Sequence, residues 1–231
     1  TPHAVVWYRK VFRLPLSFHG LRVRLVFGAV DYHAKVWING TVMGEHEGGY
    51  APFSFDITDA LKPGDNCIAV RVEDQESAAQ ARGKQSLEKQ SSGIFYTRCT
   101  GIWQSVWLEG TGTAHIDCIQ VLADPGTGVV RVTAWVHAAP SHQEIVATVT
   151  LPEKGTYSFR KEFAPALEEP QPVPVTLERA VAPIRCWSVE SPTLYGLRVE
   201  IRRGHITWDR VSTYFAFRRI EAQEGKVWLN D

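Results

Sequence analysis

The chain is dominated by an alternation of apolar and polar side chains with a period of two. In residues 21–27 the apolar side chains occupy the odd positions, and arginines occupy two of the even ones. The same alternation returns in residues 130–137 and 197–202. Because successive side chains of a strand point to opposite faces, this pattern predicts strands with one face in a core and the other in water.

Turn signals separate the predicted strands. Asn39-Gly40 indicates a two-residue hairpin, because both turn positions require a positive φ. The hairpin explains Asn39 better than the glycosylation sequon that it also begins. Loops containing Pro and Gly are predicted at residues 62–66 and 124–128.

Helical periodicity is almost absent. Residues 76–82 are the one exception, and they are predicted to form a helical turn or a mobile loop. Residues 164–174 are rich in Pro, Glu and Ala and are predicted to form a loop. Short strands joined by polar turns indicate an all-β fold of two consecutive β-sandwiches.

A break in the strand pattern near residues 110–114 suggests a domain boundary, because Gly and Thr alternate there. We expect a first domain over residues 1–112 and a second over residues 113–218. The second is about the size of an immunoglobulin-like domain. Residues 219–231 follow it as a separate segment.

Composition narrows the range of functions. Lys plus Arg equal Asp plus Glu at 25 each, so the formal net charge is zero. A general nucleic-acid binder needs a basic surplus, and none is present. No apolar run approaches the roughly 20 residues that span a bilayer, and no signal peptide is recognisable. We therefore expect neither a nucleic-acid nor a membrane partner, and the compartment stays undetermined.

The four cysteines show no metal-binding spacing. They lie at positions 67, 99, 118 and 186, and Cys67 and Cys118 fall within predicted strands. We expect free and mostly buried thiols rather than a disulfide framework, because domains of this size do not need staples.

Five blocks along the chain carry a resemblance to a known family. Residues 27–58 begin Phe-Gly-Ala-Val-Asp and end Phe-Ser-Phe-Asp-Ile-Thr, and residues 101–109 read Gly-Ile-Trp-Gln-Ser-Val-Trp-Leu-Glu. Further blocks lie at residues 7–12, 184–195 and 215–230. In order and spacing these blocks resemble the non-catalytic N-terminal region of glycoside hydrolase family 2, which includes β-galactosidases, β-glucuronidases and β-mannosidases.

The resemblance implies a galactose-binding-like jelly roll followed by an immunoglobulin-like sandwich. Residues 219–231 would then lead into the family's catalytic barrel, and a further strand would precede the first block. Retaining glycosidases use two carboxyl groups, and in this family both lie in the barrel. No acidic residue here stands in a motif for either role, so we assign no catalytic residue and expect the chain alone to be inactive.

Candidate substrate-binding residues follow from the resemblance, which places the end of the 96–103 segment near the substrate cleft. Trp103 is a candidate for stacking on a sugar, with domain-interface packing as the alternative. Tyr96 and Arg98 belong to the same segment. For Arg98 an ion pair with a barrel carboxylate is favoured over a bond to a substrate hydroxyl.

Other candidates lie in the loops around this segment. Lys84 and Gln85 stand in a variable loop that approaches the active site in relatives, so they are candidate subsite residues. Asp31 is expected to bind the backbone of its own loop, with substrate binding as the alternative. His46 and Glu47 resemble a metal pair, but adjacent strand residues point to opposite faces. We therefore expect no metal site there and no cofactor.

Three functions from different classes remain open. The preferred one is the supporting region of a β-galactosidase-like hydrolase, whose partners are its own barrel and a carbohydrate substrate. Galactosides are favoured over glucuronides and mannosides. The alternatives are an autonomous carbohydrate-binding module, which would expose two or more coplanar aromatic rings, and an adhesive sandwich pair. We also expect a homodimer through an apolar surface near Trp103 and residues 214–220.

Overall fold

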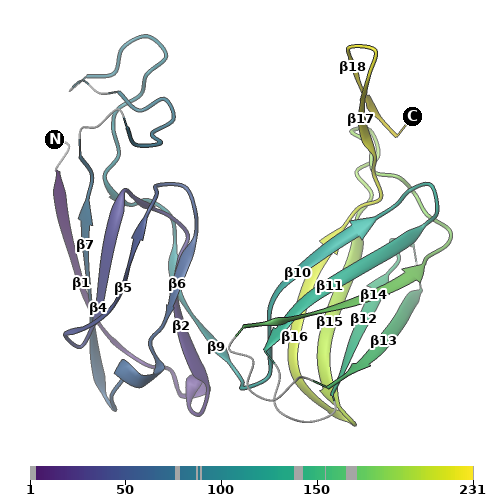
Figure 1. Cartoon of the computed structure of the whole chain (residues 1–231), viewed down its shortest axis with the longest axis horizontal. Coiled ribbons are helices and arrows are strands. Elements are labelled where there is room, and N and C mark those ends of the chain that lie inside the picture. The colour runs from purple at the N-terminus through teal and green to yellow at the C-terminus, as the bar shows by residue number, and fades with distance from the viewer. Residues whose placement is uncertain are drawn as a thin grey trace. The chain divides into compact units, whose positions relative to one another are not determined.

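The computed structural model describes residues 4–75, 79–86, 88, 90–137, 143–153, 155–164 and 171–230 (Figure 1). The named elements are antiparallel β-strands and two short 3-10 helices, Leu16–Phe18 and Thr58–Ala60. The all-β prediction is therefore confirmed. Within the described ranges, no helix is long and apolar enough to cross a membrane.

The chain divides into two compact units, Thr1–Thr111 and Gly112–Asp231. The first unit contains a four-stranded, a three-stranded and a two-stranded sheet. The four-stranded sheet has the order β1 (Val5–Arg13), β7 (Asp65–Glu73), β4 (His33–Ile38), β5 (Thr41–Glu47). The others are β6 (Phe53–Asp56), β2 (Arg22–Phe27), β9 (Val106–Thr111), and β3 (Val30–Asp31) with β8 (Gly101–Ile102).

The core of the first unit is built from the apolar positions of β2, β4 and β7. Val23, Leu25 and Phe27 of β2 are at most 4% exposed, as the alternation predicts. The Phe27 ring stacks on Phe53 of β6 with centroids 4.8 Å apart. Full burial of a side chain of this size stabilises the fold by about 1.5–3 kcal/mol. The three buried side chains of β2 are therefore a major part of the core of this unit.

The predicted hairpin at residues 39–40 is confirmed. Asn39 and Gly40 have φ values of 52° and 89°, and they join β4 to β5. The Asn39 amide donates to the carbonyl of Ala60 and to Asn66 Oδ1, both at 2.8 Å, and accepts from the amide of Cys67 at 2.9 Å. The amide that the glycosylation sequon would offer is thus occupied by hydrogen bonds within the fold.

The second unit contains two sheets and a separate hairpin. One sheet has the order β10 (His115–Ala123), β11 (Val129–His137), β14 (Val173–Ala180). The other has the order β13 (Thr156–Phe163), β12 (Gln143–Thr150), β15 (Tyr195–Arg203), β16 (Ile206–Phe215). Strands β17 (Ile220–Gln223) and β18 (Lys226–Leu229) pair only with each other among the described strands (Figure 1).

The core of the second unit follows the predicted alternation. The inward positions of β11, residues 130, 132, 134 and 136, are 0% exposed, and those of β15 are at most 2% exposed. Tyr195 is buried at the start of β15 and stacks on Phe215 at 5.4 Å. Its hydroxyl accepts a hydrogen bond from the amide of Arg185 at 2.6 Å, so the one polar atom of this core ring is satisfied.

Glu200 corrects the expectation that the even positions of residues 197–202 face water. It is 0% exposed although it lies opposite the core face of β15. Its carboxylate accepts from Arg202 at 2.5 Å and from Arg210 at 2.7 Å, and Arg198 lies at 3.8 Å. The long arginine side chains cover the carboxylate, which the period-two pattern alone does not reveal.

Two further expectations need correction. The cysteines are free as predicted, but Cys99 and Cys118 are exposed and Cys67 and Cys186 are half-buried, so the expectation of mostly buried thiols is wrong. Cys118 is exposed on β10, which is an edge strand of its sheet. In the predicted loop at residues 164–174, residues 173 and 174 begin β14, and residues 165–170 lie outside the described residues. Of the segment 76–82, residues 76–78 also lie outside, and residues 79–82 are not helical.

Replacing Glu200 by Ala should lower the free energy of unfolding by about 2–3 kcal/mol, because arginines would lose their buried anion. The arginines are partly hydrated, which keeps the loss below that of a fully buried pair. Burial acts to raise the pKa of Glu200, but the bonds from Arg210 and Arg202 outweigh it and lower the pKa. The ion pairs of Glu200 therefore stabilise the fold at pH values above the pKa of this carboxyl in the unfolded chain. This stabilisation is lost as the pH falls through the lowered pKa of the folded chain.

Urea unfolding at pH 7 and at pH 4 tests this. The matched control is Glu178→Ala, which breaks the exposed pair with Arg131 in the same unit and should cost no more than about 1 kcal/mol. Equal losses for the two variants would show that the buried carboxylate has no special weight.

Candidate functional site

The candidate site lies in the connection between β7 and β8 of the first unit. This segment lacks the strand alternation and folds back on itself through backbone hydrogen bonds. The amide of Tyr96 donates to the carbonyl of Lys84 at 2.9 Å, and the amide of Ser86 donates to the carbonyl of Tyr96 at 2.8 Å. A loop of this kind requires further polar contacts to hold it on the sandwich, since its described apolar side chains, such as Ile94 and Phe95, are exposed.

Gln85 supplies those contacts at the centre of the loop. It is 7% exposed, and its amide nitrogen donates to Asp31 Oδ2 at 2.7 Å. Its amide oxygen accepts from the backbone amide of Cys99 at 2.7 Å. One side chain thus ties the loop both to β3 and to the backbone of Cys99, two residues before β8.

Asp31 is a buried carboxylate at the end of β3. It is 5% exposed, and burial raises its pKa, while the hydrogen bond from Gln85 acts in the opposite direction. Its other oxygen lies against Gly49, where an added Cβ would approach Oδ1 to 2.7 Å. The expected partner of Asp31 was its own loop backbone, and the structure instead gives it a side chain 54 residues along the chain.

A buried ion pair anchors the other side of the segment. Arg98 and Asp74 have side chains 3% and 2% exposed, with Nε 3.2 Å from Oδ2. Arg98 Nη2 also donates to the carbonyl of Asp74 at 2.8 Å, and the Thr100 hydroxyl donates to Asp74 Oδ2 at 2.8 Å. These additional bonds offset the desolvation of the two charges. The structure therefore places the Arg98 guanidinium in an internal pair within its own unit.

Three aromatic residues, one of them within the loop, lie where the loop meets the turn after β5. Trp103 is 44% exposed, donates from Nε1 to the carbonyl of Gly49 at 2.8 Å, and meets the Tyr50 ring edge-on at 5.9 Å. The Tyr50 hydroxyl donates to the carbonyl of Arg82 at 2.8 Å. Tyr96 is half-exposed, and its hydrogen bond with Tyr50 raises its pKa. The rings thus join the loop to the glycine-rich turn after β5.

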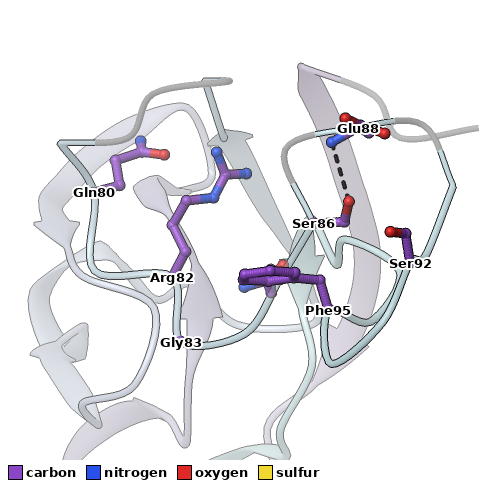
Figure 2. A pocket seen from close by; sticks show the side chains of 8 residues that line it. Gln80, Arg82, Gly83, Ser86, Glu88, Ser92 and Phe95 are labelled. Carbon is purple, nitrogen blue, oxygen red and sulfur yellow. Dashed lines mark hydrogen bonds between the residues drawn. The ribbon is translucent and has the colours of Figure 1, made fainter.

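A pocket of about 420 Å³ opens beside this network. Figure 2 shows Gln80 and Arg82 on one side, Ser86, Glu88 and Ser92 on the other, and the Phe95 ring between them. The pocket therefore combines amide, hydroxyl, guanidinium and carboxylate groups with one half-exposed ring. The donors and acceptors of such a lining can bind hydroxyl groups of a ligand, and the aromatic ring can stack on an apolar face of the same ligand.

The structure brings some of the predicted residues together. Asp31, Gln85 and Tyr96 belong to one connected network, and Gln85 also lines the pocket. Lys84 is exposed, and its carbonyl holds Tyr96. Their roles in substrate binding stay predictions.

The remaining pocket residues were missed. They lie in an aperiodic segment, and the only signal in it is a cluster of Ser and Gln around the aromatic residues 95 and 96. The residues that line the pocket without having been predicted are Gln80, Arg82, Gly83, Ser86, Glu88, Ser92 and Phe95.

His46 and Glu47 point apart, as adjacent strand residues must. The His46 ring stacks on Phe53 at 4.1 Å, whereas Glu47 is exposed and hydrogen-bonds to Tyr32. They do not form a ligand pair. Trp107 of β9 is 41% exposed, and its Nε1 donates to Glu109 Oε1 at 2.7 Å.

The fold and the site define a protein of two consecutive β-sandwiches, with a pocket on the first sandwich that is lined by polar groups and one aromatic ring. Two models of one family match nearly all of this chain. Residues 1–111 match the sugar-binding domain of glycosyl hydrolases family 2, and residues 114–218 match the domain described as glycosyl hydrolases family 2. The chain belongs to glycoside hydrolase family 2.

Relatives match this chain over almost its whole length but extend well beyond it. A β-galactosidase of Thermoanaerobacter pseudethanolicus is 27% identical over 98% of this chain and 30% of its own length. A putative β-glucuronidase of Formosa agariphila is 30% identical over 97% of this chain and 20% of its own length. The crystal structure of a Bacteroides uniformis β-glucuronidase has a TM-score of 0.82 at 24% identity, covering 98% of this chain and 28% of that one, which shows the shared fold. The chain thus spans less than a third of the length of these relatives.

Replacing Asp31 by Ala should lower the free energy of unfolding by about 1–3 kcal/mol, because the buried Gln85 amide loses its acceptor. Asp31→Asn keeps an acceptor oxygen and removes the buried charge, so it should cost less. Because the folded pKa of Asp31 is raised, ionisation destabilises the fold as pH rises. Relative to the parent chain, Asp31→Asn should therefore become more favourable between about pH 4 and pH 7.

Urea unfolding of the parent and both variants at the two pH values provides the measurement. Losses that are equal for Ala and Asn, with no dependence on pH, would contradict this account of the Asp31–Gln85 pair.

Proposed function

We propose that residues 1–231 form the non-catalytic N-terminal region of a β-galactosidase-like glycoside hydrolase. In this proposal the chain supports a catalytic barrel and lines part of the substrate cleft. The observation that carries the proposal is the coverage: both domain models match in series, while the Thermoanaerobacter β-galactosidase is more than three times as long as this chain. Among the matched relatives, a β-galactosidase and a putative β-glucuronidase represent two sugar classes.

The pocket beside Gln85 supports a role in the cleft. Its Phe95 ring is 49% exposed and lies among side chains that can both donate and accept hydrogen bonds. A pyranose presents hydroxyl groups at its rim and C–H groups on its face, which such a lining matches. The pocket is held by the buried Gln85 and Arg98, so its shape is supported from inside the unit.

The hairpin β17–β18 supports a role in holding a further domain. It exposes Ile220 at 58%, Val227 at 76% and Trp228 at 46%. A two-stranded hairpin by itself is marginally stable in water. Its base is fastened by Asn230, which donates to the carbonyl of Trp187 at 2.7 Å and accepts from the amide of Arg219 at 3.0 Å. In our proposal the exposed apolar side chains pack on the barrel. Of these, Ile220 also belongs to the surface near Trp103 and residues 214–220 through which we expect a homodimer of the chain alone.

One observation favours an autonomous carbohydrate-binding module as a second candidate. Trp7 and Trp37 lie on the outer face of the four-stranded sheet with their planes 26° apart, and Trp7 is 60% exposed. The rings stack on each other at 5.5 Å, with Arg71 over Trp7 and Lys35 over Trp37. Because these contacts occupy ring faces that a sugar would need, the supporting role is preferred.

The isolated chain should hydrolyse none of the nitrophenyl β-galactoside, β-glucuronide and β-mannoside substrates. In the full-length polypeptide, Phe95→Ala should lower kcat/KM about 10- to 100-fold, since a lost ring contact is worth about 1–3 kcal/mol. Leu16→Ala, which trims an 81% exposed side chain of the same unit, is the control and should leave kcat/KM unchanged. Turnover by the chain alone, with contaminants excluded, would overturn the proposal. An unchanged kcat/KM in Phe95→Ala would show that the pocket does not contribute to the substrate cleft.

Calorimetric titration of the isolated chain with galactose, lactose and longer oligosaccharides separates the two candidate functions. The supporting role predicts no saturable binding at millimolar sugar. Saturable binding that disappears in Trp7→Ala, but persists in the control Leu16→Ala, would establish the binding module instead.

A further inference from the structure

A second cluster of chemically active side chains lies in the second unit. His115 begins β10 and pairs in register with His137 at the end of β11. Asp117 follows two residues after His115. One ligand atom from each of these three side chains lies within 4.8 Å of the other two.

Strand geometry explains why the three side chains share a face. Ile116 and Val136 are buried in the core, so the neighbouring positions 115, 117 and 137 point to the opposite face of the sheet. The register shifts between Ile116 and Cys118, which leaves Asp117 as the extra residue of a β-bulge. Bulges re-aim side chains and recur next to functional sites.

The hydrogen bonding of His115 fixes which ring nitrogen is available. His115 is 8% exposed, and its Nδ1 lies 3.0 Å from the carbonyl of Gly112. A carbonyl oxygen only accepts, so Nδ1 carries the proton, and Nε2 of the neutral ring presents a lone pair. Metal-binding histidines have this arrangement, in which a backbone carbonyl orients the ring through the nitrogen that does not bind the metal.

The two imidazoles face each other across the strands. Their centroids are 4.6 Å apart and their planes 22° apart, so they stack without a hydrogen bond between the rings. The nearby Asp209 accepts from the backbone amides of Ile116 at 2.7 Å and Arg210 at 2.8 Å. Its carboxylate thus supports the strand backbone and adds negative charge beside the cluster.

We propose that His115, Asp117 and His137 bind a divalent transition-metal ion such as Zn²⁺. Two imidazole nitrogens and one carboxylate oxygen suit Zn²⁺, with a fourth position left for water. Bonds of about 2.0–2.1 Å place tetrahedral ligand atoms about 3.4 Å apart, so the cluster must contract slightly on binding. His137 is half-buried and Asp117 is exposed, so both can rotate toward the buried His115. Mg²⁺ and Ca²⁺ prefer sets of oxygen ligands and should not compete.

An ion held here would join the first residues of β10 to the last residues of β11. It would act within the second unit and independently of the proposed hydrolase function. Because an ion that binds only the folded state stabilises it by mass action, its signature is a metal-dependent rise in Tm.

Calorimetry with ZnCl₂ on the untagged chain should give one site per chain with a dissociation constant in the micromolar range. At a 100-fold excess over that constant, Tm should rise by roughly 5 °C or more. Co²⁺ should give the visible absorption bands of a four-coordinate site. MgCl₂ should change neither binding nor Tm.

His137→Ala and Asp117→Asn test the ligands without removing the buried His115. Each should weaken Zn²⁺ binding by more than about 10-fold. Loss of an outer-shell partner already costs about 10- to 100-fold in metal affinity, and loss of a direct ligand should cost at least as much. The controls are His205→Ala, an exposed histidine of the same unit, and Cys118→Ser, the neighbouring thiol. Both should retain the parent affinity. Absence of saturable Zn²⁺ binding, or binding that survives both ligand variants, would overturn the proposal.

Discussion

The structure depends on one constraint, which is that every second side chain of a strand must leave water. In each unit antiparallel sheets enclose the apolar positions, and residues such as Phe27 and Val132 are completely buried. That burial supplies the main favourable free energy of folding. Segments that cannot follow the alternation have to be held by other means. The connection between β7 and β8 is such a segment, and buried polar contacts hold it in place.

The polar contacts of that connection form a small buried network beside the apolar core. Asp31 and Asp74 are both buried, but their surroundings differ. Asp74 faces the guanidinium of Arg98, whereas Asp31 faces the neutral amide of Gln85. Asp74 also acts to raise the pKa of Asp31. A buried network of this kind is rigid when every member is satisfied, which is why the adjacent pocket can keep a defined shape.

Sequence reasoning reached the features that depend on near neighbours. The alternation in residues 130–136 predicted a strand with one buried face, and Asn39-Gly40 predicted a hairpin, because both signals are local. It failed where distant strands decide the outcome. Glu200 has the position of an exposed residue, but arginines from β15 and β16 cover it. The pocket around Phe95 escaped notice because an aperiodic loop carries no repeating pattern from which its shape could be inferred.

Strand β1 forms one edge of the four-stranded sheet and pairs only with β7 among the described strands. An open edge offers unpaired backbone groups to any other strand and is therefore a route to aggregation. Here the edge carries Arg9, Lys10 and Arg13, all of them exposed. Arg13 is paired with Asp65 of β7, but two copies that met edge to edge would bring Arg9 and Lys10 of both chains together. The positive charge therefore makes β1 a poor template for adding a second copy.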